Sequence, residues 1–461
     1  MDEYSASPAR QSAPSPRILL TATNRWSLAA RLASGFVELD SIVAAVCPIN
    51  GHPLRKVRGV ARLYEYGARN PLKSLRAAIQ QFAPDLIVPV CDRSVMHLHQ
   101  LHAQCAKEGV SGRNICSVIE RSLGQASSFS VVSSRYDLMM LSKGAGIRIP
   151  ETIRVDSLDD LRQWEDHLPC LLKSDGSSCG LGVKRVGSIK SGAKILRQLT
   201  RRLTAVGLIS RLLFYRDRGW TISKWAEPSP GMIAQAIVAG RPANCTAVCW
   251  KGKLLAGIAV EVIQTDGPCE PAIVVEIVEG REMLEAARKI ADQLHLSGFF
   301  GLDFMIEEGT GAAYLIEMNP RCAPPCSLNL GGTRDLLGAI WSELINTDLP
   351  NRPAVTDKRR IAYFPTAVLR GIAEMGQSGL CYLDIPIGQP ELVEELLHPW
   401  SEMNWAGTLL YWIRQHVPFK RHIRHLLGRD RVQASSATLD DGNTGRANIC
   451  APEVTPQNDW R

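Results

Sequence analysis

Long apolar runs are missing from this sequence. No stretch of about 18 or more apolar residues occurs, which is the length that a helix needs to cross a bilayer. We therefore expect no membrane-spanning helix. Residues 1–16 are rich in Ser, Pro and Ala and lack the apolar core of a signal peptide. We expect a disordered leader there and a cytoplasmic protein.

Zinc-binding and common phosphate-binding motifs are also missing. The 13 cysteines are scattered and odd in number. The pairs Cys245/Cys249 and Cys322/Cys326 are four residues apart, but no histidines follow them at zinc-site spacing. We interpret the cysteines as thiols in a reducing compartment. Neither the Walker A sequence nor the Rossmann glycine fingerprint occurs.

The composition is that of a globular protein with several subdomains. A chain of 461 residues that is 45% apolar can form two or three packed units. The net charge of +7 is modest, and we expect no nucleic-acid partner. Near the N-terminus, apolar strands alternate with amphipathic helices, which predicts a parallel α/β sheet. The predicted elements are strand 17–21, helix 26–34, strand 42–47, helix 72–82 and strand 85–90.

Two charged residues follow the last of these strands. Asp92 and Arg93 stand beyond a strand end, where open α/β sheets bind their ligands. They fit either a solvated loop pair, which we favour, or a substrate contact.

A later pair of strands carries acidic residues at matched positions. Residues 299–306 and 312–318 are apolar-rich, and the turn residues 307–311 separate them. A hairpin centred on Thr310 would place Asp303 directly opposite Glu317. Because side chains alternate along a strand, Glu317 and Asn319 would share a face.

Such an arrangement has two interpretations. The acids could be solvated residues on the outer face of an ordinary hairpin. However, like charges directly opposite on a sheet are destabilising, and a buried charge needs a partner or a metal. Mg²⁺ takes one or two carboxylates and completes its shell with water and phosphate oxygens. The convergence of three oxygen ligands therefore favours a magnesium site.

An upstream loop has the composition of a phosphate-binding loop. An apolar strand ends at Lys173 and runs into the Gly/Ser-rich residues 174–182. Small residues let backbone N–H groups approach phosphate oxygens, and a lysine supplies a positive charge. A flexible hairpin loop is the alternative interpretation.

Together these features resemble a known family. Gly-x-Asp-Phe at 301–304, followed by Glu-Met-Asn-Pro-Arg at 317–321, resembles the metal-binding signature of the ATP-grasp superfamily. The resemblance implies that Asp303, Glu317 and Asn319 hold one or two Mg²⁺ ions, with Mn²⁺ as a substitute, that bridge the phosphates of ATP. It also implies that Arg321 faces the transferred phosphoryl group.

The same resemblance assigns the nucleotide site. Lys173 matches the family's phosphate lysine, and Arg135 stands where the family often has another lysine. The loop would close over the triphosphate and the hinge would pass beside the adenine. In the hinge, Gln235 matches the family, whereas Ala236 replaces the usual acid and leaves the adenine and ribose contacts open. The nucleotide-binding residues implied are Arg135, Lys173, Ser177, Ser178, Gly180, Gln235, Ile237 and Val238.

The implied fold is α/β (α+β). A Rossmann-like domain would precede a two-lobed ATP-grasp fold, and a C-terminal helical extension would follow it. The expected segments are a leader at 1–16, the Rossmann-like domain at 17–122, the phosphate-loop lobe at 123–239, the metal-hairpin core at 240–350, the extension at 351–432 and a disordered tail at 433–461.

The implied activity is that of an ATP-dependent carboxylate–amine ligase. Lys173 and Arg321 would act in catalysis, and the partners would be a small-molecule carboxylate and an amine, with a thiol as the alternative acceptor. A homodimer stays open. So does an ATP-binding protein of this fold without ligase activity, such as a sensor or a scaffold.

The C-terminal part contains a basic amphipathic segment. Residues 412–431 interleave Lys, Arg and His with apolar side chains. A helix packed on the domain with a solvated basic face explains this pattern. Weak contact with an anionic membrane surface is the alternative, in which case the protein would act as a membrane-surface partner through this segment.

Overall fold

The computed structural model describes residues 15–48, 51–176, 182–200, 213, 231–267, 271–372 and 379–397. The expected leader, basic segment 412–431 and tail therefore lie outside the described residues, apart from Ser15 and Pro16. None of the described helices is both long and apolar enough to cross a membrane.

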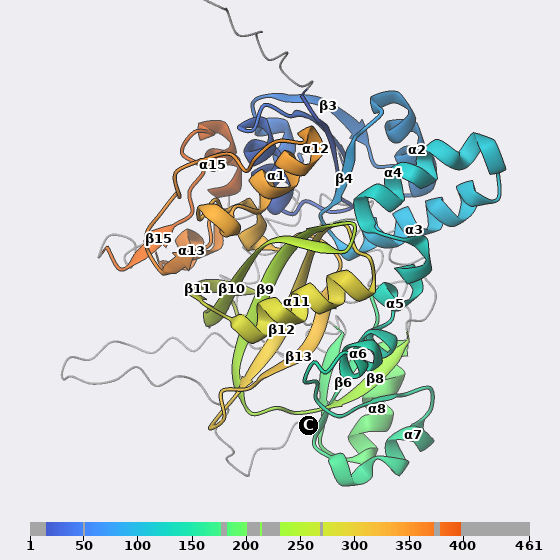
Figure 1. Cartoon of the computed structure of the whole chain (residues 1–461). Coiled ribbons are helices and arrows are strands. Elements are labelled where there is room, and N and C mark those ends of the chain that lie inside the picture. Colours follow the sequence, from blue (N-terminus) through green and yellow to red (C-terminus); the bar gives the residue numbers. More distant parts are fainter. Residues whose placement is uncertain are drawn as a thin grey trace, which may run out of the picture.

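The N-terminal domain contains a parallel sheet with strand order β3-β2-β1-β4 (Figure 1). Apart from the first residues Arg17 and Ile42, the residues of β1, β2 and β4 are buried, whereas the edge strand β3 has no buried residue and includes the polar Arg62 and Glu65. Helix α1 packs on one face of the sheet, and α2, α3 and α4 pack on the other. The elements are β1 (Arg17–Thr21), α1 (Leu28–Val37), β2 (Ile42–Cys47), β3 (Val60–Glu65), α2 (Pro71–Phe82), β4 (Leu86–Pro89), α3 (Asp92–Ala106) and α4 (Arg113–Leu123).

This arrangement confirms the predicted parallel α/β domain. Strand β3 was not predicted: it is only six residues long, and Arg62 and Glu65 interrupt its apolar residues. Helix α1 begins at Leu28 and ends at Val37, so the predicted helix 26–34 is displaced by two to three residues.

A small lobe follows, with an antiparallel sheet of order β5-β8-β6-β7 (Figure 1). Helices α7 and α8 cover its apolar face, where Leu161 of α7 packs in one core with Leu172 of β6 and Ala234 of β8. The elements are α5 (Phe129–Ser133), α6 (Arg135–Gly144), β5 (Thr152–Arg154), α7 (Leu158–Gln163), β6 (Cys170–Ser174), β7 (Val183–Val186), α8 (Ile189–Thr200) and β8 (Met232–Ala236).

The largest sheet has the order β13-β12-β9-β10-β11-β14-β15. Helix α11 covers one face, and α12 together with α1 covers the other (Figure 1). The elements are β9 (Gly240–Trp250), β10 (Lys253–Thr265), β11 (Ala272–Val278), α11 (Arg281–Gln293), β12 (Gly298–Glu307), β13 (Ala313–Asn319), α12 (Leu336–Ile345), β14 (Arg360–Ala362), α13 (Thr366–Leu369), β15 (Cys381–Leu383) and α15 (Pro390–Leu397).

Short 3-10 turns connect several of these elements. They are η1 (Pro53–Lys56), η2 (Gly109–Gly112), η3 (Ala126–Ser128), η4 (Glu165–His167), η5 (Pro324–Ser327) and η6 (Gly332–Arg334).

One hydrophobic core joins the N-terminal domain to the large sheet. Phe36 of α1 packs edge-on against Phe299 of β12, with ring centroids 6.4 Å apart. Buried residues of β1, β2, β10, β12 and α12 continue the same core. The two units therefore share apolar surface instead of meeting through a polar linker.

The described part of the C-terminal extension belongs to the large sheet. Strand β14 pairs with β11, and β15 pairs with β14, so the extension contributes strands as well as the helices expected. Arg25 forms a 2.6 Å ion pair with Glu395 of α15, and Arg31 pairs with Asp384 after β15. These contacts fasten the extension to the N-terminal domain.

The ten cysteines of the described residues are all free thiols, and nine of them are buried. This agrees with the interpretation of the cysteines as structural thiols.

Candidate functional site

The β12–β13 hairpin brings the two acids together as predicted. Asp303 pairs with Glu317 and Gly301 pairs with Asn319. The register shifts by one between Asp303 and Phe304, because Phe304 pairs with Leu315 and leaves Ile316 as an extra residue. The turn is therefore centred half a residue before Thr310, and the bulge restores the predicted pairing of the acids.

The pairing of the two carboxylates is electrostatically unfavourable. Burial, and next the Glu317 carboxylate, raise the pKa of Asp303 to about 6, although Arg321, Asn319 and Lys173 act in the opposite direction. The amide Nδ2 of Asn319 donates to Asp303 Oδ2 at 2.9 Å. The site thus gathers negative charge and amide groups in a setting that favours a cation.

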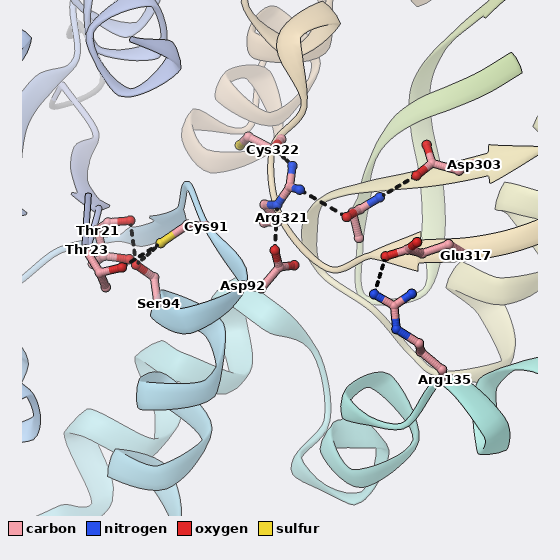
Figure 2. Close-up of polar contacts among 11 residues, drawn as sticks. Thr21, Thr23, Cys91, Asp92, Ser94, Arg135, Asp303, Glu317, Arg321 and Cys322 are labelled. Carbon is pink, nitrogen blue, oxygen red and sulfur yellow. Dashed lines mark hydrogen bonds and ion pairs between the residues drawn. The ribbon is translucent and has the colours of Figure 1, made fainter. Parts of the chain in front are cut away.

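Arg135 supplies part of the compensating charge. It is the first residue of α6, and the hydroxyl of the preceding Ser134 accepts a hydrogen bond from Asp137 N at 3.2 Å, which caps the helix. Its Nη2 lies 2.7 Å from Glu317 Oε1 (Figure 2). Burial alone would lower the pKa of Arg135, but Glu317 and Asp175 raise it overall. The arginine is therefore a permanent cation at the acid pair.

Lys173 approaches the same hairpin from the small lobe. It lies in β6 and is only 3% exposed. Its Nζ donates to the carbonyl oxygen of Ile316 at 3.1 Å. Ile316 is the bulge residue, so the bulge provides the oxygen that the lysine binds.

Arg321 follows β13 and is held on several sides. Its Nε donates to Asp92 Oδ2 at 3.2 Å, its Nη1 to Cys322 O at 3.0 Å and its Nη2 to Asn319 Oδ1 at 3.0 Å (Figure 2). The guanidinium also lies over the Trp26 ring, 4.9 Å from its centroid. The planar fork is thus oriented before any ligand binds.

The contact with Asp92 corrects the interpretation of that residue as part of a solvated loop pair. Asp92 begins α3 directly after β4, and β4 neighbours β1 at the point where the strand order reverses. Its side chain is 23% exposed and pairs with Arg321. The position of Asp92 beyond a strand end did indicate a residue with a binding partner. That partner is Arg321 of this chain and not a substrate.

Two polar residues of β9 extend the row of acids and were not identified from the sequence. Asn244 is paired with Asp303, and Thr246 is paired with Gly301. Asn244 Oδ1 and Thr246 Oγ1 are buried, and neither has a hydrogen-bond partner among the residues that the structure describes. The available signal was a pair of polar side chains two positions apart within the mostly apolar residues 243–250.

Residues 216–325 match the family model of the ATP-grasp domain. This match includes β8, β9, β12 and β13 with the row of acids. The chain contains an ATP-grasp domain. No curated protein sequence matches it.

Solved structures show the same fold over most of the chain. An N5-carboxyaminoimidazole ribonucleotide synthetase in its ADP complex is 12% identical, with a TM-score of 0.55, and the match covers 79% of this chain and 86% of that one. The Staphylococcus aureus N5-carboxyaminoimidazole synthetase with ADP is 15% identical (TM-score 0.51; 73% and 79% covered). A Campylobacter jejuni biotin carboxylase in a β-γ-ATP complex is 14% identical (TM-score 0.52; 73% and 72% covered).

The predicted phosphate loop of the ATP-grasp domain is only partly described. Ser177, Ser178 and Gly180 lie outside the described residues. At the base of this loop, Ser174 N donates to Gly182 O at 3.0 Å, which closes the hairpin between β6 and β7. The role of the loop therefore stays a prediction.

The predicted hinge lies where β8 ends and β9 begins. Gln235 is 1% exposed, and its Nε2 donates to Thr152 Oγ1 at 3.2 Å, so its side chain links β8 to β5. Ile237 is 42% exposed and lies in the linker with Val238. The side chain of Gln235 therefore packs inside the small lobe, between β8 and β5. The contacts of the hinge with adenine stay a prediction.

The residues present fit a hard divalent ion. In the described part of the chain, no group of three or more His, Cys, Asp or Glu side chains could hold a metal. The ATP-grasp hairpin instead offers two carboxylates and one amide, all with oxygen atoms. Such a set suits Mg²⁺, which is usually bound by one or two carboxylates plus water and phosphate oxygens.

Proposed function

We propose that this protein is an ATP- and Mg²⁺-dependent ligase that activates a carboxylate and couples it to an amine. The observation that carries the proposal is the convergence of three cationic side chains on one acidic hairpin. Arg135 of α6, Lys173 of β6 and Arg321 after β13 surround the opposed pair Asp303 and Glu317. The ATP-grasp domain match and the fold shared with ADP- and ATP-bound enzymes support it.

The acidic row would hold the metal. Asp303, Glu317 and Asn319 would bind one or two Mg²⁺ ions, which neutralise charge on the phosphates of ATP. In the structure Asn319 Oδ1 accepts a hydrogen bond from Arg321 and its Nδ2 donates one to Asp303, so its amide would turn over to direct the oxygen at a cation beside Asp303. Turning it over would direct its NH₂ group toward Arg321 and weaken that contact.

This linkage suggests how Arg321 is released for chemistry. Two of its N–H groups donate to side chains, one to Asn319 and one to Asp92. The hydrogen bond to Asn319 would be lost on metal binding. An arginine freed on one side and still fixed by Asp92 could direct its fork at the transferred phosphoryl group. Lys173 would add a second cation beside the same hairpin.

The reaction follows from these roles. A carboxylate oxygen attacks the γ-phosphorus of ATP, which gives an acyl phosphate and ADP. An amine then attacks the acyl carbon, so that the C–N bond forms, the C–O bond to phosphate breaks and the amine loses a proton. Catalysis would be mainly positioning and charge stabilisation, because the phosphoryl transition state demands little covalent chemistry from the protein.

The decisive experiment is an ADP-release screen over pooled carboxylates and amines with ATP and Mg²⁺. We expect release that requires both a carboxylate and an amine. Asp303→Asn should reduce it by orders of magnitude, whereas the exposed Asn351→Ala should behave like the wild type. Full activity of Asp303→Asn would refute the metal assignment.

An ATP-binding protein without ligase activity is the second candidate. It is favoured by the hinge, where Ala236 replaces the family's acid and the side chain of Gln235 is bound to Thr152. Nucleotide binding with no acceptor-dependent ADP release in the same screen would support it. ADP release that requires a thiol in place of an amine would support ligase activity with a different acceptor.

A further inference from the structure

The polar surface of the acidic hairpin continues onto a third strand. In the large sheet β12 lies between β13 and β9. One row across these strands contains Glu317, Asp303 and Asn244, and the next row contains Asn319, Gly301 and Thr246. Directly paired residues point to the same side of a sheet, so Asn244 and Thr246 share the face of the proposed metal ligands.

The opposite face of β9 has a different role. Ala243, Cys245 and Ala247 are buried in the apolar core beneath α11. The polar residues are therefore confined to the side that carries Asp303. Core packing explains Ala243, Cys245 and Ala247, but it does not explain the polar residues Asn244 and Thr246.

Both polar residues lack a partner for a buried oxygen. Thr246 is 0% exposed, and Asn244 is half-buried with a buried Oδ1. Neither Thr246 Oγ1 nor Asn244 Oδ1 makes a hydrogen bond to any described residue. Their neighbour Asn319 has both ends of its amide engaged. A buried acceptor without a donor costs free energy, so these two oxygens do not stabilise the fold as they stand.

Gly301 keeps the space between the two rows open. It does not adopt a positive φ, so its backbone does not require glycine. A Cβ atom placed there would lie 3.7 Å from the Cβ of Ala323 and 3.8 Å from the Cβ of Asn319. The missing side chain thus leaves room above the sheet between Thr246 and Asn319.

We propose that Asn244 and Thr246 accept hydrogen bonds from water molecules bound to the divalent ion of the acidic hairpin. The inference rests on the proposed metal site. Mg²⁺ keeps several of its waters when it binds to proteins, and coordinated water is a strong donor. The two orphaned oxygens supply acceptors beside Asp303, and outer-shell acceptors of this kind orient the ligands and raise metal affinity.

The test measures metal binding without turnover. Mn²⁺ would be titrated into the full chain with ADP and followed by electron paramagnetic resonance. Asn244→Ala and the isosteric Thr246→Val should each weaken Mn²⁺ binding by about 10- to 100-fold. Neither should lower the metal-free melting temperature, because each removes an oxygen that bonds to no residue in the described ranges. Asn351→Ala is the matched control on the exposed surface.

The outcomes separate this inference from the proposed function. If Asp303→Asn abolishes Mn²⁺ binding while Asn244→Ala and Thr246→Val bind like the wild type, only the role of the two β9 residues is wrong. If Asp303→Asn also binds normally, the metal site itself is wrong. A marked loss of metal-free stability in Asn244→Ala would mean that the residue serves the fold, and would overturn the inference.

Discussion

Replacing Arg135 by methionine tests the electrostatic account of the site directly. The Arg135 and Glu317 side chains are 11% and 19% exposed, so their 2.7 Å contact is a largely buried ion pair. Removing one partner of a buried pair costs about 3–5 kcal/mol, because the remaining charge has no compensation. Here the cost should lie at the upper end, since Glu317 would face Asp303 across the strands.

The measurement is urea unfolding of the full chain in EDTA, followed by circular dichroism. We expect Arg135→Met to lose about 4 kcal/mol and the double variant Arg135→Met/Glu317→Gln to recover about 2 kcal/mol of it. Adding Mg²⁺ alone should stabilise Arg135→Met more than the wild type, because the ion supplies the missing positive charge.

A matched control uses another arginine. Arg162 pairs with Asp159 at 2.6 Å, but these side chains are 59% and 72% exposed. Arg162→Met should therefore cost less than about 1 kcal/mol. If Arg135→Met were equally harmless, or if the added Glu317→Gln destabilised it further, the opposed carboxylates would not be the source of the effect.

Three further predictions concern other parts of the molecule. Asp92→Asn should lower kcat by about 10- to 100-fold with little change in the KM for ATP, because Arg321 loses the anion that orients its fork; an unchanged kcat would show that Arg321 is oriented without it. Gly301→Val should reduce Mn²⁺ affinity by filling the space beside Thr246 while the chain still folds, which calorimetric titration and circular dichroism would check. His52 is buried, and this burial lowers its pKa to about 4 from 6.5. Because the unfolded chain binds the proton more tightly, stability should fall by about 3 kcal/mol as the pH drops from 6.5 to 4, and His52→Gln should remove that part of the pH dependence in urea unfolding.

The sequence predicted those parts of the site that depend on local pattern. Opposition of Asp303 and Glu317 followed from the symmetry of a short turn, and the structure confirms it. The bulge at Ile316 was not predictable, because one extra residue in a strand changes neither composition nor periodicity. The turn is centred half a residue before Thr310, where the prediction had placed its centre. Because the bulge adds one residue to β13, Asp303 and Glu317 pair nevertheless.

The parts that were missed depend on contacts between distant segments. Asp92 and Arg321 are 229 residues apart, and no local pattern indicates that they meet. Asn244 lies beside Asp303 only because β9 is inserted next to β12 in the sheet order. Strand β3 was missed for a different reason, since charged residues such as Arg62 and Glu65 can stand in a short edge strand and interrupt its apolar pattern.

The shared packing around Phe36 and Phe299 has a consequence for how this chain could be divided. Separating the N-terminal domain from the rest of the chain would expose apolar surface on each fragment, including the face of α1 that packs against the large sheet. Separately produced halves should consequently aggregate or associate with one another, and mixing them should restore one folded particle. A change of relative orientation between these two units would require the same surface to be exposed, so the framework that presents Asp92 to Arg321 is built to stay rigid.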